Sequence, residues 1–364
     1  MKMNPLQQLE KCGQSIWLDY IKRDLFVDGT LKKLISDDCL RGMTSNPSIF
    51  EKAIDEGHDY DKDIKTMAGE GKTVEEIYEA LTQKDVQDAA DEFRPIYKQT
   101  DGKDGYVSLE VNPHLANDTK GTIAEARRLW KALDRPNVLI KVPATKEGLP
   151  AIQQLISEGI NVNVTLLFGL TRYREVAEAY IAGIEARVAA GKAVGQIASV
   201  ASFFLSRIDV LLDPILKKQN ETQLQGQMAI ASAKIAYQIF DELFRSDRFK
   251  KLAEQRVSVQ RLLWASTSTK NPDYSDVKYV EALIGPLTVN TLPLETIVAY
   301  RDHGNPEDRL DSDVQKMKSY FERVSELGIN IEQVAQQLEN EGVAKFVAAY
   351  DQLIEILKKK SGND

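Results

Sequence analysis

The feature that most restricts the fold of this chain is a repeated alternation of short apolar runs with longer helical patterns. The apolar runs predict strands, and periodic stretches such as 122–133 and 172–191 predict helices. The predicted strands cover residues 15–19, 40–44, 106–111, 138–142, 160–168, 197–204, 261–266 and 287–291. Strands that alternate with helices favour parallel pairing. Eight such units predict an α/β fold of the (β/α)8 TIM-barrel type, which typically needs about 250 residues.

An open, doubly wound sheet is the alternative architecture for the same alternation. It usually carries a glycine-rich phosphate turn after its first strand, and neither GxGxxG nor GxxxxGK[ST] occurs here. The chain of 364 residues is longer than a minimal barrel. We therefore predict a single domain over residues 1–364, with a polar helical insertion at 57–104 and C-terminal helices at 306–361.

Composition excludes several classes of function. The net charge of −8 gives no basic excess for binding nucleic acid. No apolar run reaches the roughly 18 residues that suggest a membrane span. Cys12 and Cys39 form no CxxC motif, as expected for a reducing cytoplasm, where we expect the protein to be located. His58, His114 and His303 lie far apart and predict no zinc site.

Polar residues recur near the ends of the predicted strands. They are Asp19, Thr44, Ser45, Asn46, Ser108, Glu110, Lys141, Asn163, Thr165, Ser202 and Ser266. Residues two apart in a strand face the same side, so Ser108 with Glu110, and Asn163 with Thr165, are predicted to point inward together. In this fold the active site lies at the carboxyl ends of the strands, so the recurrence predicts a polar site there.

Lys141 is the most informative of these residues because it interrupts the apolar run VLIKVP. A lysine is rarely buried without a partner. In one interpretation Lys141 reaches solvent or pairs with Glu110 and has a structural role. In the other, its apolar surroundings favour the free amine, which attacks a carbonyl as a Schiff-base nucleophile.

Structural alternatives also apply to the other candidates. Taken alone, Asp19 is better explained as a satisfied strand-end carboxylate or a helix cap. Asn46 precedes a proline, as a normal helix N-cap does. Glu110 could serve only as the partner of Lys141, and Arg207 could pair with a carboxylate of its own helix. Residues 265–276 could form an ordinary polar turn.

Three segments resemble the transaldolase family of class I Schiff-base aldolases. RGMTSNPSIF at 41–50 is similar to the asparagine-containing signature of the family, and VLIKVPATKEGLPAI at 138–152 is similar to its lysine signature. GINVNVTLLF at 159–168 is similar to a third block. The resemblance spans nearly the whole chain, its length is that of the longer bacterial branch, and it implies a (β/α)8 barrel.

The resemblance implies four catalytic residues. Lys141 matches the Schiff-base lysine. Asp19 matches the aspartate that removes a hydroxyl proton when the carbon–carbon bond is cleaved. Glu110 and Thr165 match the pair that holds a proton-shuttling water.

The resemblance also implies a set of substrate-binding residues. Asn46 and Asn163 match amides that hold substrate hydroxyls and the intermediate. The remaining matches are polar or aromatic residues lining the site, and an arginine that binds the substrate phosphate: Thr44, Ser108, Ser202, Phe204 and Arg207.

The chain departs from the shorter branch of the family after its seventh predicted strand. An arginine in an ASFR-like segment is replaced here by ASTSTKN, which has none. We expect Lys270 to supply the second positive charge, with hydroxyl donors from Ser266 or Ser268. A lysine would act as a point charge, where an arginine offers a planar fork.

The sequence thus predicts a transaldolase-type transferase of the non-oxidative pentose phosphate pathway. It would move a dihydroxyacetone unit reversibly from sedoheptulose 7-phosphate to glyceraldehyde 3-phosphate, giving erythrose 4-phosphate and fructose 6-phosphate. We expect no metal or organic cofactor, sugar phosphates as the partners, and a monomer or homodimer. The alternatives are a lysine aldolase that releases free dihydroxyacetone or uses a deoxy sugar, and a sugar-phosphate-binding barrel without catalysis.

Overall fold

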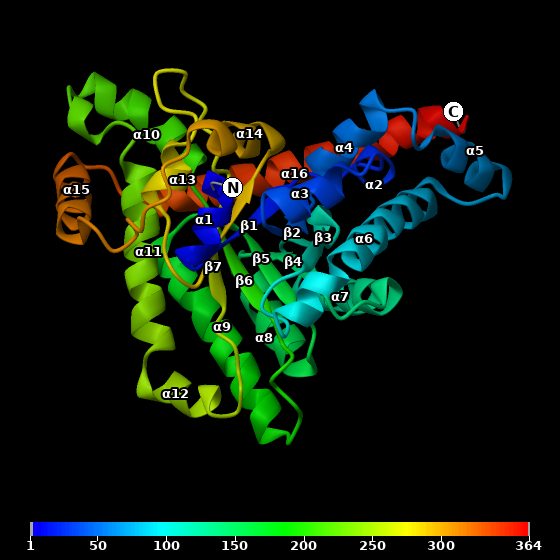
Figure 1. The fold of residues 1–364 in the computed structure, drawn as a ribbon, viewed down its shortest axis with the longest axis horizontal. Coiled ribbons are helices and arrows are strands. Elements are labelled where there is room, and N and C mark those ends of the chain that lie inside the picture. The colour runs from blue at the N-terminus through cyan, green and yellow to red at the C-terminus, as the bar shows by residue number, and fades with distance from the viewer. Residues whose placement is uncertain (1–2, 363–364) are drawn as a thin grey trace.

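The computed structural model describes residues 3–362 and contains a closed barrel of eight parallel strands, hydrogen-bonded in chain order (Figure 1). The strands are β1 (Gln14–Asp19), β2 (Leu40–Thr44), β3 (Tyr106–Glu110), β4 (Val138–Pro143), β5 (Val162–Leu167), β6 (Ser199–Phe204), β7 (Arg261–Ala265) and β8 (Thr288–Leu292). The (β/α)8 barrel predicted from the sequence is confirmed, and the strand bounds differ from the predicted ones by at most two residues.

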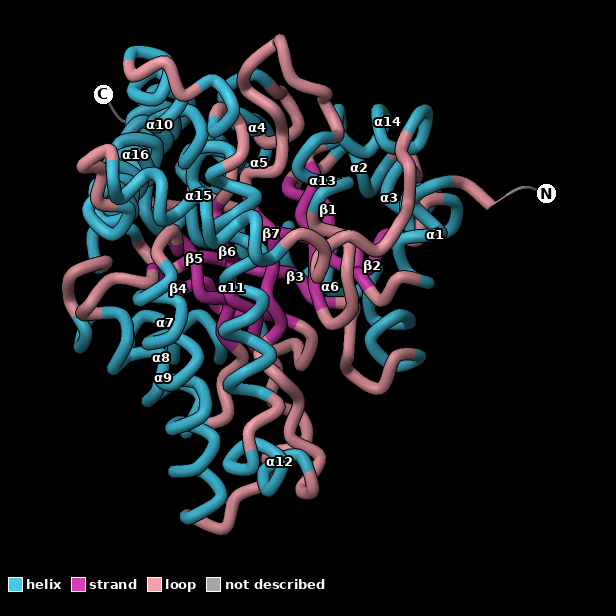
Figure 2. The backbone as a smooth tube through the Cα atoms, turned by 90° about the vertical axis from the view of Figure 1, so that its left-hand side faces the viewer, coloured by secondary structure: helices cyan, strands magenta, loops and turns pink. Residues whose placement is uncertain are grey.

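Helices surround the barrel, and Figure 2 shows the strands enclosed by them. In the first half of the chain they are α1 (Pro5–Lys11), α2 (Asp24–Val27), α3 (Thr30–Asp37), α4 (Pro47–Glu56), α5 (Asp61–Gly69), α6 (Val74–Gln99), α7 (Thr119–Leu133) and α8 (Gly148–Glu158). In the second half they are α9 (Leu170–Ala189), α10 (Ser206–Lys218), α11 (Met228–Phe244), α12 (Asp247–Ala253), α13 (Lys278–Ala282), α14 (Leu294–His303), α15 (Val314–Glu326) and α16 (Ile331–Ser361). Two short 3₁₀ turns, η1 (Pro113–Leu115) and η2 (Thr222–Leu224), complete the described elements.

The amino-terminal end of the barrel is filled by a buried polar cluster and a tryptophan. Asp104 accepts hydrogen bonds from Ser15 (2.8 Å), Arg261 (2.9 Å) and the indole N–H of Trp17 (3.2 Å). A Cβ at Gly42 would lie 2.6 Å from the Trp17 ring, so only glycine fits beside it. Side chains thus occupy the barrel interior beneath the site, as expected for this fold.

The insertion and the C-terminal helix α16 lie together, although they are far apart in the sequence. The long helix α16 contacts α4, α5 and α6, and it also contacts the strand β5 and the helix α10. Figure 1 shows α16, in red, running beside the blue helix α4. The C-terminal segment therefore forms part of the wall around the carboxyl ends of the strands.

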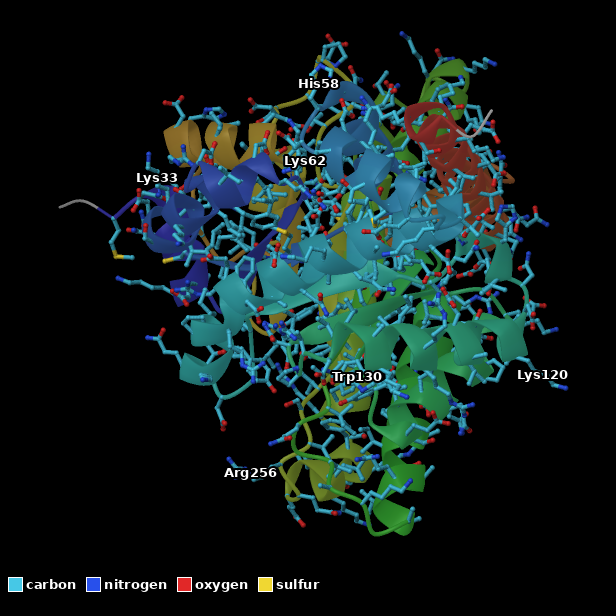
Figure 3. All side chains as sticks on the ribbon, turned by 90° about the vertical axis from the view of Figure 1, so that its right-hand side faces the viewer. Lys33, His58, Lys62, Lys120, Trp130 and Arg256 are labelled. Atoms are coloured by element: carbon cyan, nitrogen blue, oxygen red, sulfur yellow. The ribbon has the colours of Figure 1, made fainter. Side chains whose placement is uncertain are left out.

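Most charged side chains extend outward from the surface. Figure 3 shows Lys33 and Lys120 projecting away from the ribbon, and both are exposed. Lys141 differs from them because only 4% of its surface is accessible. Within residues 3–362, no helix has both the length and the apolar character needed to cross a membrane.

Candidate active site

A cavity of about 230 Å³ opens at the carboxyl ends of the barrel strands. Most of the residues predicted for the site line it: Asp19, Thr44, Asn46, Lys141, Thr165, Ser202, Phe204, Arg207 and Lys270. The three other predicted residues, Glu110, Ser108 and Asn163, are also buried on the strands but do not line the cavity. The fold therefore gathers most of the predicted residues around one space and places the others behind them.

Strand register places the candidate nucleophile between an acid and an amide. Lys141 on β4 pairs with Glu110 on β3 and with Asn163 on β5. Its Nζ atom donates a hydrogen bond of 3.0 Å to the carbonyl of Ser45 and lies 3.5 Å from Oε2 of Glu110. Lys141 thus has the polar partners that a buried lysine needs. It also lines the cavity.

The carboxyl group of Glu110 is buried, and only 6% of the residue is exposed. Burial raises the pKa of Glu110 to about 7, and Lys141 opposes this shift. Both carboxyl oxygens are buried without a hydrogen-bond partner among the described residues. A carboxyl group with a pKa near neutrality can both donate and accept a proton at physiological pH.

A bulge in β5 determines where Thr165 lies. The register with β6 shifts between Val164 and Leu167, and Leu166 has a left-handed backbone with φ of +56°. Such a conformation is unfavourable for a branched residue and often occurs at functional sites. The Thr165 hydroxyl is buried without a partner among the described residues and lines the cavity.

A hydrogen-bonded chain fixes the amide of Asn163 beneath the cavity. Its Nδ2 donates to Oγ of Ser108 at 3.0 Å, and its Oδ1 accepts from Oγ of Ser202 at 2.7 Å. Because a serine hydroxyl can donate or accept, these two bonds hold the amide in place in either orientation. Ser202 reaches the cavity, whereas Ser108 and Asn163 form the layer behind it.

Asp19 is the last residue of β1 and Asn46 follows β2, so both lie at the rim of the cavity. Thr44 donates a hydrogen bond of 2.7 Å from Oγ1 to Oδ1 of Asp19, which orients that carboxylate. Asn46 is the N-cap of α4, where its Oδ1 accepts from the Ile49 N–H at 3.0 Å. Because the cap uses the oxygen, the amide nitrogen of Asn46 remains available to the cavity that the residue lines.

Arg207 provides a positive charge in the first turn of α10. Its guanidinium carbon lies 5.5 Å from the centre of the Phe204 ring. Its Nη1 is buried without a partner among the described residues. Burial lowers the pKa of Arg207, opposed by Glu341 and Asp19. An arginine that lacks a carboxylate partner beside a cavity is suited to binding an anion.

The segment after β7 brings a second positive charge to the cavity. Lys270 is exposed, lines the same cavity as Arg207, and donates from Nζ to Oγ of Ser268 at 2.6 Å. Ser266 has a left-handed backbone with φ of +55°, and its Oγ lies 2.9 Å from Oγ of Ser206 at the start of α10. The structure therefore places Lys270 and Arg207 around the same cavity.

One unpredicted part of the cavity wall comes from the C-terminal helix α16. Phe346 of α16 lines the cavity and is buried, and Gly342 lies one helical turn before it. A Cβ at Gly342 would lie 3.0 Å from Leu166 and 3.7 Å from Nη1 of Arg207. The amphipathic pattern predicts the helix itself, but no local signal indicates that this helix closes the barrel mouth.

Further unpredicted lining residues come from β7, β8, the helices α4 and α14, and the segments that follow β7 and β8. They are Ser48, Leu263, Ala265, Thr267, Thr291, Pro293 and Glu295. Over residues 3–362, no group of three or more His, Cys, Asp or Glu side chains is arranged to hold a metal ion. Each of the three histidines lies within hydrogen-bond distance of an aspartate instead.

Comparisons with known proteins agree with this geometry. The family described as Transaldolase/Fructose-6-phosphate aldolase matches residues 16–357. A protein named Transaldolase from Trichodesmium erythraeum is 49% identical over 373 aligned positions, covering 99% of this chain and 98% of the relative. One of the same name from Saccharopolyspora erythraea is 46% identical, covering 98% and 97%. Another from Thiobacillus denitrificans is 45% identical, covering 97% and 99%.

Proposed function

This chain belongs to the transaldolase/fructose-6-phosphate aldolase family, and we propose that Lys141 is the nucleophile with which it transfers dihydroxyacetone between sugar phosphates. The chain is an enzyme that transfers aldehyde or ketone groups. One observation supports the role of Lys141 above all others. Its buried amine borders the cavity and lies 3.5 Å from a carboxyl group whose pKa is raised to about 7.

The first step is formation of the Schiff base. The amine of Lys141 attacks the ketone carbon of sedoheptulose 7-phosphate or fructose 6-phosphate to give a carbinolamine. The carbinolamine hydroxyl takes up a proton and leaves as water, which gives the iminium ion. Glu110 is the proposed proton source, acting through a water molecule that Thr165 also holds. The raised pKa of Glu110 supports this role.

The second step breaks the carbon–carbon bond. Asp19 accepts the proton of the C4 hydroxyl, the C3–C4 bond breaks, and its electron pair moves into the iminium to give an enamine on Lys141. The released aldehyde is erythrose 4-phosphate or glyceraldehyde 3-phosphate. The hydrogen bond from Thr44 orients Asp19 for this transfer. Because the iminium is the electron sink, the mechanism uses neither a metal nor an organic cofactor.

The enamine must then survive until an acceptor aldehyde binds. Asn46 and Asn163 are the proposed amides that hold its hydroxyl groups, with Ser108 and Ser202 fixing Asn163 from either side. Attack of the enamine on the acceptor reverses the two steps. Walls of the cavity such as Phe346 would exclude water and so favour transfer over release of dihydroxyacetone.

The phosphate group of the substrate is assigned to the rim opposite Asn46. Arg207 is the proposed main ligand because its Nη1 is buried without a partner among the described residues. Lys270, supported by Ser268, supplies the second charge. Phosphate sites in this fold often follow the seventh and eighth strands, which agrees with this placement.

The wider setting follows from the same proposal. Sugar phosphates are the expected partners, in the non-oxidative pentose phosphate pathway, and the expected assembly is a monomer or homodimer. A cytoplasmic location is proposed because Cys12 and Cys39 are both free thiols. The family also includes fructose-6-phosphate aldolases, so release of free dihydroxyacetone is the competing activity to be measured.

Trapping the intermediate tests the proposal. The chain would be incubated with fructose 6-phosphate, reduced with borohydride and digested, and the modified peptide located by mass spectrometry. A three-carbon adduct on Lys141, and none on exposed Lys33 or Lys120, is the expected result. Absence of any adduct on Lys141 in folded protein that still binds phosphate would contradict the mechanism and favour a binding protein without catalysis.

A further inference from the structure

The two proposed phosphate ligands come from different elements of the fold. Arg207 lies in the first turn of α10, and Lys270 lies in the segment between β7 and α13, residues 266–277, here termed the β7 loop. Both line the same cavity. A phosphate can contact both charges only if the β7 loop is held at a fixed distance from α10.

Tyr274 connects the middle of the β7 loop to α10. Its hydroxyl donates a hydrogen bond of 2.7 Å to Oδ2 of Asp213. The other oxygen of that carboxylate accepts from the Gly226 N–H at 2.8 Å. Lys278 lies over the Tyr274 ring, with its Nζ 3.6 Å from the ring centre. Asp213 therefore holds the loop and α10 against the segment that precedes α11.

A second connection of the same kind lies next to the end of the β7 loop. The hydroxyl of Tyr279, in α13, donates a hydrogen bond of 2.8 Å to Oδ2 of Asp209. The Ala229 N–H, in α11, donates to Oδ1 at 2.8 Å. Asp209 is only 1% exposed and follows Arg207 by two residues on α10. Neither Asp209 nor Asp213 lines the cavity, and each of their carboxylate oxygens already accepts a hydrogen bond within the protein, so neither is proposed as a substrate ligand.

We propose that Asp209 and Asp213 are positioning residues that hold the β7 loop on α10, so that Arg207 and Lys270 face the same phosphate group. The inference rests on the proposed function, because it assumes that these two cations bind the substrate phosphate. Binding groups on separate elements act together only when a supporting layer fixes their geometry. If the loop is already ordered before the substrate binds, binding does not include the entropic cost of ordering it.

The Tyr274→Phe variant is the most direct test because Tyr274 is only partly buried and its ring remains. Loss of one hydrogen bond to a charged group typically changes an equilibrium constant by roughly tenfold to a hundredfold. We expect the KM for fructose 6-phosphate to rise by about that factor, and inhibition by inorganic phosphate to weaken equally. The kcat for fructose 6-phosphate, and the KM for unphosphorylated fructose with glyceraldehyde as acceptor, should stay unchanged.

Tyr60→Phe is the matched control. Tyr60 donates a hydrogen bond of the same length, 2.7 Å, to the carboxylate of Asp85, and neither residue lines the cavity. We expect this variant to lose stability without any change in the KM for fructose 6-phosphate. Asp213→Asn, which keeps the shape of the side chain, should reproduce the effect of Tyr274→Phe.

Failure of this inference can be separated from failure of the proposed function. If unaltered protein forms the Lys141 adduct but folded Tyr274→Phe and Asp213→Asn show normal KM and normal phosphate inhibition, the positioning role is wrong. An equal loss of activity on fructose and on fructose 6-phosphate would also overturn it, because a positioning role specific to phosphate leaves fructose unaffected. Absence of the adduct in unaltered protein would instead refute the function itself.

Discussion

Nζ of Lys141 and Oε2 of Glu110 lie 3.5 Å apart on neighbouring strands, and both side chains are almost completely buried. The contact has two consequences. It gives the buried Lys141 a carboxyl partner. It also places a group that can exchange a proton beside the proposed nucleophile. Burial raises the pKa of Glu110 to about 7 even though Lys141 opposes the shift, so the protonation of Glu110 should change near neutral pH.

Glu110→Gln should therefore slow the reaction and change its pH dependence. We expect a fall in kcat of roughly 10²- to 10⁴-fold, the usual contribution of a general acid or base. The rate at which the borohydride-trapped adduct forms should show an inflection near pH 7 in the unaltered protein, the pKa of Glu110, and none there in the variant. An unchanged inflection would assign the titration to another group.

The same carboxyl group should make stability depend on pH. Its pKa is raised from 4.5 to about 7, so the folded state binds more protons than the unfolded state between those values. Its favourable contribution is therefore fully present below the lower value and is lost as the pH rises through the higher one. Urea unfolding should show a larger decline in the free energy of unfolding over this range for unaltered protein than for Glu110→Gln.

Arg207→Lys should weaken phosphate binding selectively. A lysine keeps the charge but loses the planar pair of donors, and a hydrogen bond to a charged group is worth about 1.5–3 kcal/mol. We expect the KM for fructose 6-phosphate to rise roughly tenfold to a hundredfold, with little change for unphosphorylated fructose. Equal losses for the two substrates would argue that Arg207 acts on folding or on the chemical step.

Gly342→Ala should depart from the normal behaviour of a helical glycine. Alanine in a helix interior is usually more stable by about 0.5–1 kcal/mol. Here the new Cβ would lie 3.0 Å from Leu166, next to Thr165 in the β5 bulge. We expect no gain in thermal stability and a lower kcat, because the new methyl group would displace Leu166 and distort the bulge that positions Thr165.

Gly69→Ala is the control for that helix substitution. Gly69 is the last residue of α5, and a Cβ there would meet nothing within 4 Å. We expect this variant to be as stable as the unaltered protein or slightly more so, with unchanged activity. If the two variants had the same thermal stability and kcat, the close approach of α16 to Leu166 would not affect activity.

Phe346→Leu should increase release of free dihydroxyacetone relative to transfer. The leucine is smaller than the buried phenylalanine, so water would reach the enamine on Lys141 more readily. We expect a loss of stability of about 1–2 kcal/mol and a higher ratio of released dihydroxyacetone to transferred product. That ratio can be measured directly with and without the acceptor aldehyde, and an unchanged ratio would assign Phe346 a packing role only.

Much of the barrel and of its candidate site was predictable because the responsible signals are local. Alternation of apolar runs with helical patterns predicts βα units. The end of each strand can be predicted from the few residues around it. The same holds for Asn46, whose position before Pro47 predicts the observed helix cap. The apolar run at 138–142 also predicts correctly that Lys141 lies within a buried strand.

Only the tertiary structure decided which distant residues complete the site. Phe346 and Gly342 reach the barrel mouth because α16 packs across it, and Tyr279 meets Asp209 across 70 residues of chain. Such contacts depend on how whole elements pack together, and no periodicity within a helix or loop encodes them. The sequence by itself therefore determined the type of each element and the chemistry at each strand end. Closure of the barrel decided which of those groups lie within reach of Lys141.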